Sequence, residues 1–229
     1  MEGPQAVRAA VAAGALEQLF ATPSGAERHP DLPVTALVDD RALDVLAETV
    51  TPQGLVGTAR LVTVGLAGAL AGTPRLVCVL VEPRDPGNAG TVIRCADAAG
   101  ADAVVLVGDA VDPHNGKCVR ASAGSLWHLP ISTGEGLPTV VGALRRAGLR
   151  VVAATGHADR DLDTASDAGE LAAPTGWLFG TEADGLPPEA LALADASVRV
   201  PMHGSAESLN LATAAAVCLY ASARAQRRP

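Results

Sequence analysis

The sequence predicts an α/β fold built on a parallel sheet, and three observations support this. Short, continuous apolar runs, typical of strands buried on both faces, recur from residue 75 onward. Stretches of helical character separate these runs, and this alternation is typical of parallel strands joined by covering helices. Glycine and polar residues follow most of the runs, at the edge of the sheet where such folds bind ligands.

The strands of this sheet are expected at apolar segments such as LVCVLV and VVLVG. The segments cover residues 75–82, 101–108, 149–156, 176–180 and 196–202. Each contains valine, leucine or another residue that favours strands, and each ends near a glycine, a proline or a charged residue. The second part of the chain is therefore expected to form one domain.

Residues 1–64 have shorter elements and predict a smaller α/β unit. We expect a helix over residues 4–19, strands near 17–22 and 34–38, a helix after Asp39 and Asp40, and a closing strand over 54–62. Residues 65–74 are mostly small and end in a proline, which predicts a linker without a buried face. The expected domains are therefore 1–64 and 75–229.

Composition limits the class of protein. The 229 residues are 48% hydrophobic, but no apolar run approaches the roughly 20 residues that cross a bilayer. No secretory signal is visible, so we expect a cytoplasmic protein without membrane contact. The four cysteines form no C-x-x-C pair and the histidines show no ligand spacing, so we expect no metal. A net charge of −8 argues against a protein that coats nucleic acid, but it allows a local basic site.

The segments that follow the strands contain most of the candidate site residues. They are PRDPGNAGTVIR, HADRD, TEADGLPPEAL and HGSAESLNLATAAAVCLY. Any one of them could be a glycine turn or a helix cap, but together they indicate a site. The sequence lacks the glycine patterns of dinucleotide-binding folds and phosphate loops, and it lacks the hydrolase elbow, so these enzyme classes are not predicted.

Three segments resemble the signature motifs of a known family. NAGTVIRCADAAGADAVVL, LFGTEADGLP and VPMHGSAESLNLATAAAVCLY resemble, in order, the motifs of the SpoU (TrmH) group of RNA 2′-O-ribose methyltransferases, in the SPOUT superfamily. The resemblance covers about residues 75–225. It implies S-adenosylmethionine as cofactor, RNA as substrate and a homodimer formed through the catalytic domain. It also implies a deep C-terminal trefoil knot that contains HGSAESLNL and is followed by a helix to Gln226.

The first region is similar to the small RNA-binding domain of ribosomal-protein type that often precedes the catalytic domain in this family. A strand and a basic stretch usually come before EGPQAV in relatives, so we expect residues 1–64 to lack that first strand and the native N-terminus to be longer. The region has four arginines and eight acidic residues. Its RNA-binding surface would therefore be local or would use backbone groups and shape.

The resemblance also implies which residues form the site. The catalytic residues would be Arg94, Asn88, Glu182 and Asn210. Arg94, expected to have no acidic partner within helical reach, matches an arginine often described as the catalytic base. Because a guanidinium stays charged in proteins, it could instead bind the phosphate beside the target ribose and stabilise the emerging alkoxide. The cofactor would lie against the backbone of Thr155, Gly156, Leu178, Phe179, Gly180, Val200 and Met202, with Ser208, Leu209 and Leu211 closing over it.

Other roles stay open at this point. Glu182 could orient Arg94 or Asn88, or cap a helix, and Ser208 could bind RNA or cofactor. Arg84 and Arg120 are expected to contact RNA phosphate. The accessory domain favours ribosomal 23S RNA as substrate, with transfer RNA as an alternative. A catalytically silent, knotted RNA-binding protein is a further alternative, although the complete motifs argue against it. A nucleotide transferase would need a phosphate loop or paired metal carboxylates, which the sequence lacks.

Overall fold

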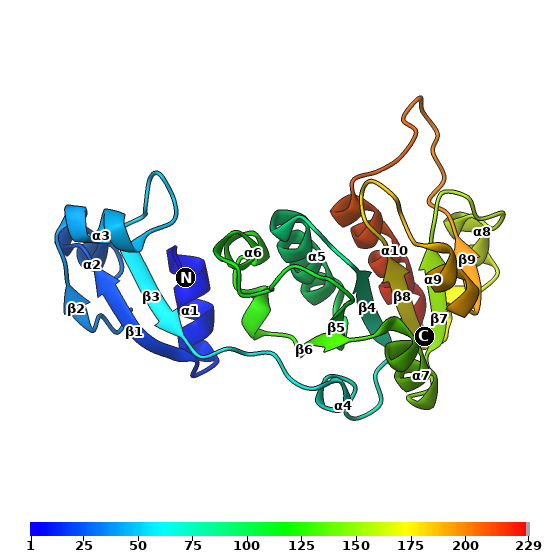
Figure 1. Cartoon of the computed structure of the whole chain (residues 1–229), viewed down its shortest axis with the longest axis horizontal. Helices are drawn as coiled ribbons and strands as arrows, with labels where there is room; N and C mark the ends of the chain where they lie inside the picture. The colour runs from blue at the N-terminus through cyan, green and yellow to red at the C-terminus, as the bar shows by residue number, and fades with distance from the viewer. Residues whose placement is uncertain (228–229) are drawn as a thin grey trace.

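The computed structural model describes residues 1–227, and two separate sheets organise them (Figure 1). The larger sheet is parallel throughout and has the strand order β6-β5-β4-β8-β7-β9. Its strands are β4 (Leu76–Val81), β5 (Ala103–Val107), β6 (Ile131–Glu135), β7 (Arg150–Ala154), β8 (Thr175–Phe179) and β9 (Ala196–Val198). The predicted α/β fold with a parallel sheet is confirmed.

Helices cover both faces of this sheet because its strands are apolar on both sides. One face packs against α5 (Pro86–Ala99), α6 (Gly116–Ser122), α8 (Leu162–Asp167) and α10 (Leu211–Gln226). The other packs against α4 (Leu66–Ala69), α7 (Leu137–Arg146) and α9 (Pro188–Leu193). On the first face, the buried indole N–H of Trp177 donates to the Ser222 hydroxyl of α10 at 2.9 Å. This bond satisfies a donor that would otherwise be costly to bury.

Helices α5 and α6 approach each other closely at Gly90. A Cβ atom at this position would lie 2.3 Å from the carbonyl oxygen of Cys118 and 2.8 Å from the Cβ of Ala121. A residue with a side chain would push the two helices apart, so the glycine permits this contact. The contact fixes α6 against the first turns of α5.

The smaller sheet belongs to an N-terminal unit, residues 1–59, with the strand order β2-β1-β3. The elements of the unit are α1 (Pro4–Ala12), β1 (Leu16–Ala21), α2 (Pro23–Arg28), β2 (Ala36–Leu37), α3 (Asp40–Leu46) and β3 (Leu55–Ala59). Val7, Leu19 and Leu55 are fully buried in an apolar cluster of its own. In Figure 1 the unit lies beside α6, to one side of the larger sheet.

The structure corrects four expectations about the elements. The helix expected over residues 4–19 ends at Ala12, because Gly14, with φ of 63°, turns the chain into β1. Residues 65–74 contain α4, whose Leu66 and Ala69 are buried against the larger sheet. Strand β6 was not expected, because its sequence ISTGE is largely polar and lies at a sheet edge. The last strand ends at Val198 rather than at residue 202.

Among residues 1–227, no helix has both the length and the apolar character that crossing a bilayer requires.

We expect Gly90→Ala to lower the free energy of unfolding by about 1–3 kcal/mol, the usual cost of overpacking. The new methyl group would overlap the Cys118 carbonyl and Ala121. Urea unfolding followed by circular dichroism measures the change. Gly142→Ala in α7 is the matched control, because its Cβ would meet only the guanidinium of exposed Arg146, at 3.3 Å. The control should keep or gain stability; equal losses in both variants would contradict the close contact.

Candidate active site

The site begins where α5 starts, beyond the carboxyl end of β4. Asp85 caps this helix by accepting the backbone N–H of Asn88 at 2.8 Å. Its second carboxylate oxygen accepts the Lys117 ammonium at 2.6 Å. The Lys117 bond, followed by the Asn88 N–H, holds the pKa of Asp85 below its ordinary value. These contacts fix Asn88 in the first turn of α5.

A chain of hydrogen bonds joins three of the predicted catalytic residues. The Asn88 amide donates to the Glu182 carboxylate, and the Asn88 carbonyl oxygen accepts the Asn210 amide at 3.1 Å. Asn210 also caps α10, because its side-chain oxygen accepts the backbone N–H of Ala212 at 2.9 Å. Asn88 thus meets Glu182, which lies 94 positions later in the sequence, and Asn210, which lies 122 positions later. We call Asn88, Glu182 and Asn210 the polar chain.

Arg94, the fourth predicted catalytic residue, lies farther along α5 and is exposed. Contrary to the sequence interpretation, an acidic residue, Asp97, does lie one turn beyond it, but the Asp97 carboxylate pairs with His128 at 2.7 Å. Within residues 1–227, no ion pair engages the Arg94 guanidinium. The structure therefore leaves this cation available to a ligand, although it does not join Arg94 to the polar chain.

A cavity of about 650 Å³ lies beside the polar chain, formed largely by the segments that follow β7, β8 and β9. Glu182 lines it, so the cavity and the polar chain share a residue. The predicted cofactor residues that line it are Thr155, Gly156, Phe179, Gly180, Val200, Met202, Ser208, Leu209 and Leu211. Leu178 is not among the lining residues, and its side chain is fully buried in the cluster on the α7 face of the sheet, because neighbouring residues of a strand point to opposite faces. A contact between the cofactor and the Leu178 backbone stays a prediction.

The cavity also has wall residues that sequence reasoning missed, among them His157, Arg199 and Glu207. The Arg199 guanidinium donates to the carbonyl oxygens of Ala158 at 2.6 Å and Asp159 at 2.8 Å. It thereby ties the segment after β7 to the end of β9. The sequence did contain one signal for Arg199: it is a charged residue directly before Val200, at the end of an apolar strand.

The walls of the cavity fit S-adenosylmethionine. Leu209 and Leu211 supply apolar surface for an adenine ring, and Thr155 and Ser208 supply hydroxyl groups. A Cβ at Gly156 would meet no atom within 4 Å, so the backbone there is open to a ligand. The volume lies within the roughly 300–1,000 Å³ of small-molecule sites.

The segment that contains Glu182 folds back on the end of β8. Thr181 and Gly185 exchange backbone hydrogen bonds of 3.1 and 3.0 Å. A Cβ at Gly180 would lie 2.0 Å from the Gly185 carbonyl oxygen. Glycine at position 180 therefore permits the turn that places Glu182 between the cavity and Asn88.

The two predicted RNA contacts have different surroundings. Arg84 is exposed in the turn between β4 and α5, near the polar chain. Arg120 is engaged by two carboxylates of the N-terminal unit, Glu2 and Glu48. Its contact with phosphate stays a prediction. Among residues 1–227, no group of three or more histidine, cysteine or acidic side chains is arranged to hold a metal ion.

Comparison with known proteins adds independent findings. The profile of the SpoU rRNA Methylase family matches residues 75–220. The 23S rRNA (guanosine(2553)-2′-O)-methyltransferase RlmP of Bacillus subtilis (strain 168) is 34% identical over 186 residues, which cover 80% of this chain and 70% of that protein. The 23S rRNA (uridine(2479)-2′-O)-methyltransferase of Streptomyces viridochromogenes is 40% identical over 147 residues, which cover 62% of this chain and 50% of that protein.

Solved structures match over nearly the whole chain. An AdoMet-bound rRNA methyltransferase from Sinorhizobium meliloti has a TM-score of 0.83 at 32% identity, covering 98% of this chain and 86% of that one. The family profile, the relatives and the AdoMet-bound structures of the same fold define the class as RNA 2′-O-ribose methyltransferases that use S-adenosylmethionine. With its family profile matched over residues 75–220, the chain belongs to the SpoU rRNA methylase family.

We expect Gly180→Ala to weaken S-adenosylmethionine binding by about tenfold or more, because the new Cβ would displace Gly185 and distort the wall of the cavity. Isothermal titration calorimetry measures this. Gly65→Ala is the control, since its Cβ would meet no atom within 4 Å and it lies away from the cavity. Unchanged affinity in Gly180→Ala would show that the cofactor does not depend on this segment.

Proposed function

We propose that this chain methylates the 2′-hydroxyl of a ribose in 23S ribosomal RNA, with S-adenosylmethionine as methyl donor. The observation that supports it most directly is the hydrogen-bonded polar chain, which shares Glu182 with the cavity. Two relatives that are 34% and 40% identical to the chain are named as 23S rRNA 2′-O-methyltransferases. An enzyme with this substrate would work in the cytoplasm.

The chemistry assigns a task to each catalytic group. Bound S-adenosylmethionine would supply an activated methyl group and leave as the thioether when its S–CH3 bond breaks. The ribose hydroxyl must lose its proton, which would pass to solvent water, as its oxygen is methylated. Because a guanidinium stays charged in proteins, we propose that Arg94 stabilises the negative charge that develops on that oxygen and does not act as the base. Asn88, held by Glu182 and Asn210, would orient the target nucleotide.

We further propose that the segment between β9 and α10 is threaded through the chain as the trefoil knot of SPOUT enzymes. This segment provides Val200, Met202, Ser208 and Leu209 to the cavity. The likeness to SpoU structures over 98% of the chain supports the proposal. The knot would hold the cofactor walls together, because it brings distant segments into one rigid site.

A homodimer through α10 is part of the same proposal. The outward face of this helix presents Thr213, Val217, Tyr220 and Arg224 at helical spacing, and all four are exposed. Val217 is 39% and Tyr220 53% exposed, so apolar surface is available for a second copy.

We propose that the N-terminal unit binds RNA. Two solved structures of an rRNA methyltransferase from Sinorhizobium meliloti each cover 98% of the chain, which includes this unit. A structure described as methylating C/U34 on tRNA covers only 68%, with a TM-score of 0.58. This difference favours ribosomal RNA over transfer RNA. A silent RNA-binding protein is disfavoured, because it would have no reason to keep the polar chain beside an open cavity.

Mapping of 2′-O-methyl groups in total RNA, from cells with and without the gene, tests the substrate. We expect one 2′-O-methyl site in 23S RNA to be absent without the gene and to return when the gene is restored. Loss of a site in transfer RNA would contradict the proposed substrate. Loss of no site in any RNA would contradict the proposed function.

We expect Arg94→Ala to reduce methyl transfer at least about a hundredfold, the scale of removing one charge-stabilising group. Folding and cofactor binding should be kept, because Arg94 is exposed and does not line the cavity. Radiolabelled methyl transfer to RNA measures the rate, with Arg146→Ala on α7 as the matched exposed-arginine control. Arg94→Lys should remain slow if the planar guanidinium is needed. Wild-type turnover in Arg94→Ala would exclude the catalytic role.

A further inference from the structure

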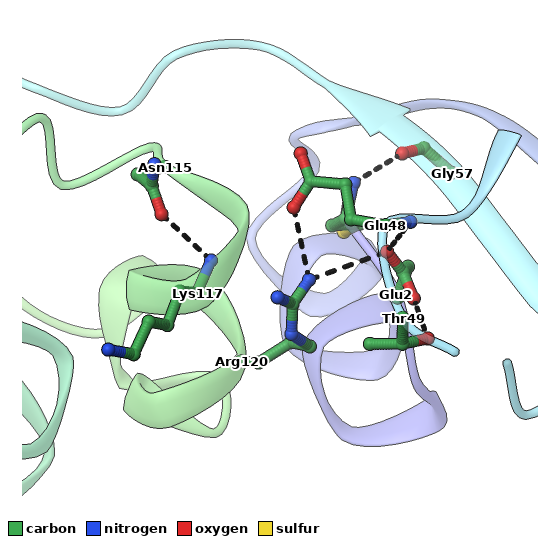
Figure 2. Close-up of polar contacts among 8 residues, drawn as sticks. Glu2, Glu48, Thr49, Gly57, Asn115, Lys117 and Arg120 are labelled. Carbon is green, nitrogen blue, oxygen red and sulfur yellow. Dashed lines mark hydrogen bonds and ion pairs between the residues drawn. The ribbon is translucent and has the colours of Figure 1, made fainter. Parts of the chain in front are cut away.

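An ionic junction joins the N-terminal unit to the catalytic part of the chain (Figure 2). One guanidinium nitrogen of Arg120, on α6, donates to Glu2 at 3.4 Å and to Glu48 at 3.1 Å. The Glu2 side chain is only 7% exposed and that of Arg120 31%, so solvent screens the first pair much less than a surface pair. We call Arg120, Glu2 and Glu48 the junction cluster.

Glu2 has two further partners inside its own unit. Its carboxylate accepts the backbone N–H of Glu48 at 2.6 Å and the Thr49 hydroxyl at 2.5 Å. Burial raises the pKa of Glu2, but the two hydrogen bonds and the charge of Arg120 outweigh it, so the pKa lies below its ordinary value. Within the junction cluster, only Arg120 belongs to the catalytic part. Removing Arg120 therefore loosens the junction while Glu2 keeps both partners within its unit.

The same short helix also contacts the catalytic helix. The Lys117 ammonium bonds to Asp85, the cap of α5 next to Asn88. In Figure 2 this ammonium points away from the two carboxylates that hold Arg120. Gly90 of α5 rests on the carbonyl oxygen of Cys118. Helix α6 thus contacts the N-terminal unit through Arg120, and the start of α5 through Lys117 and Cys118.

Apolar packing fills part of the junction: Ala6 of α1 is buried in the cluster on the α5 face of the larger sheet, and Met1 packs against that cluster. A cavity of about 220 Å³ lies next to Arg120 and is lined by both parts of the chain. Its walls include the polar side chains of Gln5, Thr49, Thr51 and Gln53. Domains joined by small, polar interfaces move relative to each other by default. The ion pairs of Arg120 therefore act beside this apolar packing to favour one orientation of the two parts.

We propose that Arg120 is a positioning residue that sets the orientation of the N-terminal unit relative to α5. An RNA bound by that unit would then present its target ribose to Asn88 and Arg94. The proposal rests on the proposed function in one respect, namely that the N-terminal unit binds RNA. Arg120 acts through Glu2 and Glu48 of the N-terminal unit. Its loss should therefore change KM for RNA and leave the affinity for S-adenosylmethionine unchanged.

Kinetics of the full chain with 23S RNA test this role. We expect Arg120→Gln to raise KM for RNA about tenfold, the scale of losing one coupled ionic contact, with kcat within about twofold of wild type. The affinity for S-adenosylmethionine should not change. Arg120→Lys should recover most of the loss, because it keeps the charge. Arg145→Gln is the matched control, since Arg145 forms an ion pair with Asp195 away from the junction. An unchanged KM in Arg120→Gln would overturn the proposal.

Glu48→Gln separates this role from a direct phosphate contact. If Arg120 positions the unit, loss of Glu48 should also raise KM for RNA, and the effects of Arg120→Gln and Glu48→Gln should not add. If Arg120 instead binds phosphate, loss of Glu48 would free its guanidinium and tighten RNA binding. Tighter binding would therefore overturn the proposal.

A readout without RNA keeps the test independent of the proposed function. We expect faster hydrogen–deuterium exchange in residues 46–53 and 116–122 of Arg120→Gln, because the junction that joins them is weakened. Exchange at the wild-type rate in both segments would overturn the proposal. If the wild-type chain methylates no RNA, the proposed function fails, while the exchange result still reports on the junction.

Discussion

The packing of α10 beside α5, over the central strands β4 and β8, is the constraint on which the site depends. Both helices bury small side chains there, such as Ala96 of α5 and Ala215 of α10, and this lets them approach the sheet and each other. Their first turns then meet beyond the ends of the strands, so Asn88 and Asn210 come within hydrogen-bond reach. The bond from Trp177 to Ser222 further ties α10 to β8, the strand that leads to Glu182.

Most of the larger sheet could be predicted from the sequence, because a strand buried on both faces must be apolar along its whole length. The sequence did not predict β6 because an edge strand has fewer positions to bury, and three of the five residues of ISTGE are polar. The first helix was drawn too long because its alanine-rich sequence continues past the turn at Gly14. α4 was taken for linker because a single helical turn contains too few residues to show a periodic pattern.

The candidate site was predictable as far as motifs reach. Three motifs in their expected order predicted Asn88, Glu182 and Asn210 as catalytic residues, and the structure joins these residues by hydrogen bonds. The motifs predicted a backbone contact at Leu178 but not the direction of its side chain, which packs on the α7 face of β8 because of the pleat of the strand. Nor could the motifs give the partners of Arg120, since Glu2 lies 118 residues and Glu48 72 residues away.

The junction cluster has a consequence for chimeric enzymes. Its two acidic side chains belong to the N-terminal unit, whereas its arginine belongs to the catalytic part. A unit grafted from another member of the family keeps this docking geometry only if it brings carboxylates to the places of Glu2 and Glu48. Exchanging the N-terminal unit without keeping the junction cluster would therefore change two properties of the chimera. Its RNA-binding surface would differ, and so would the orientation of the unit relative to the catalytic part.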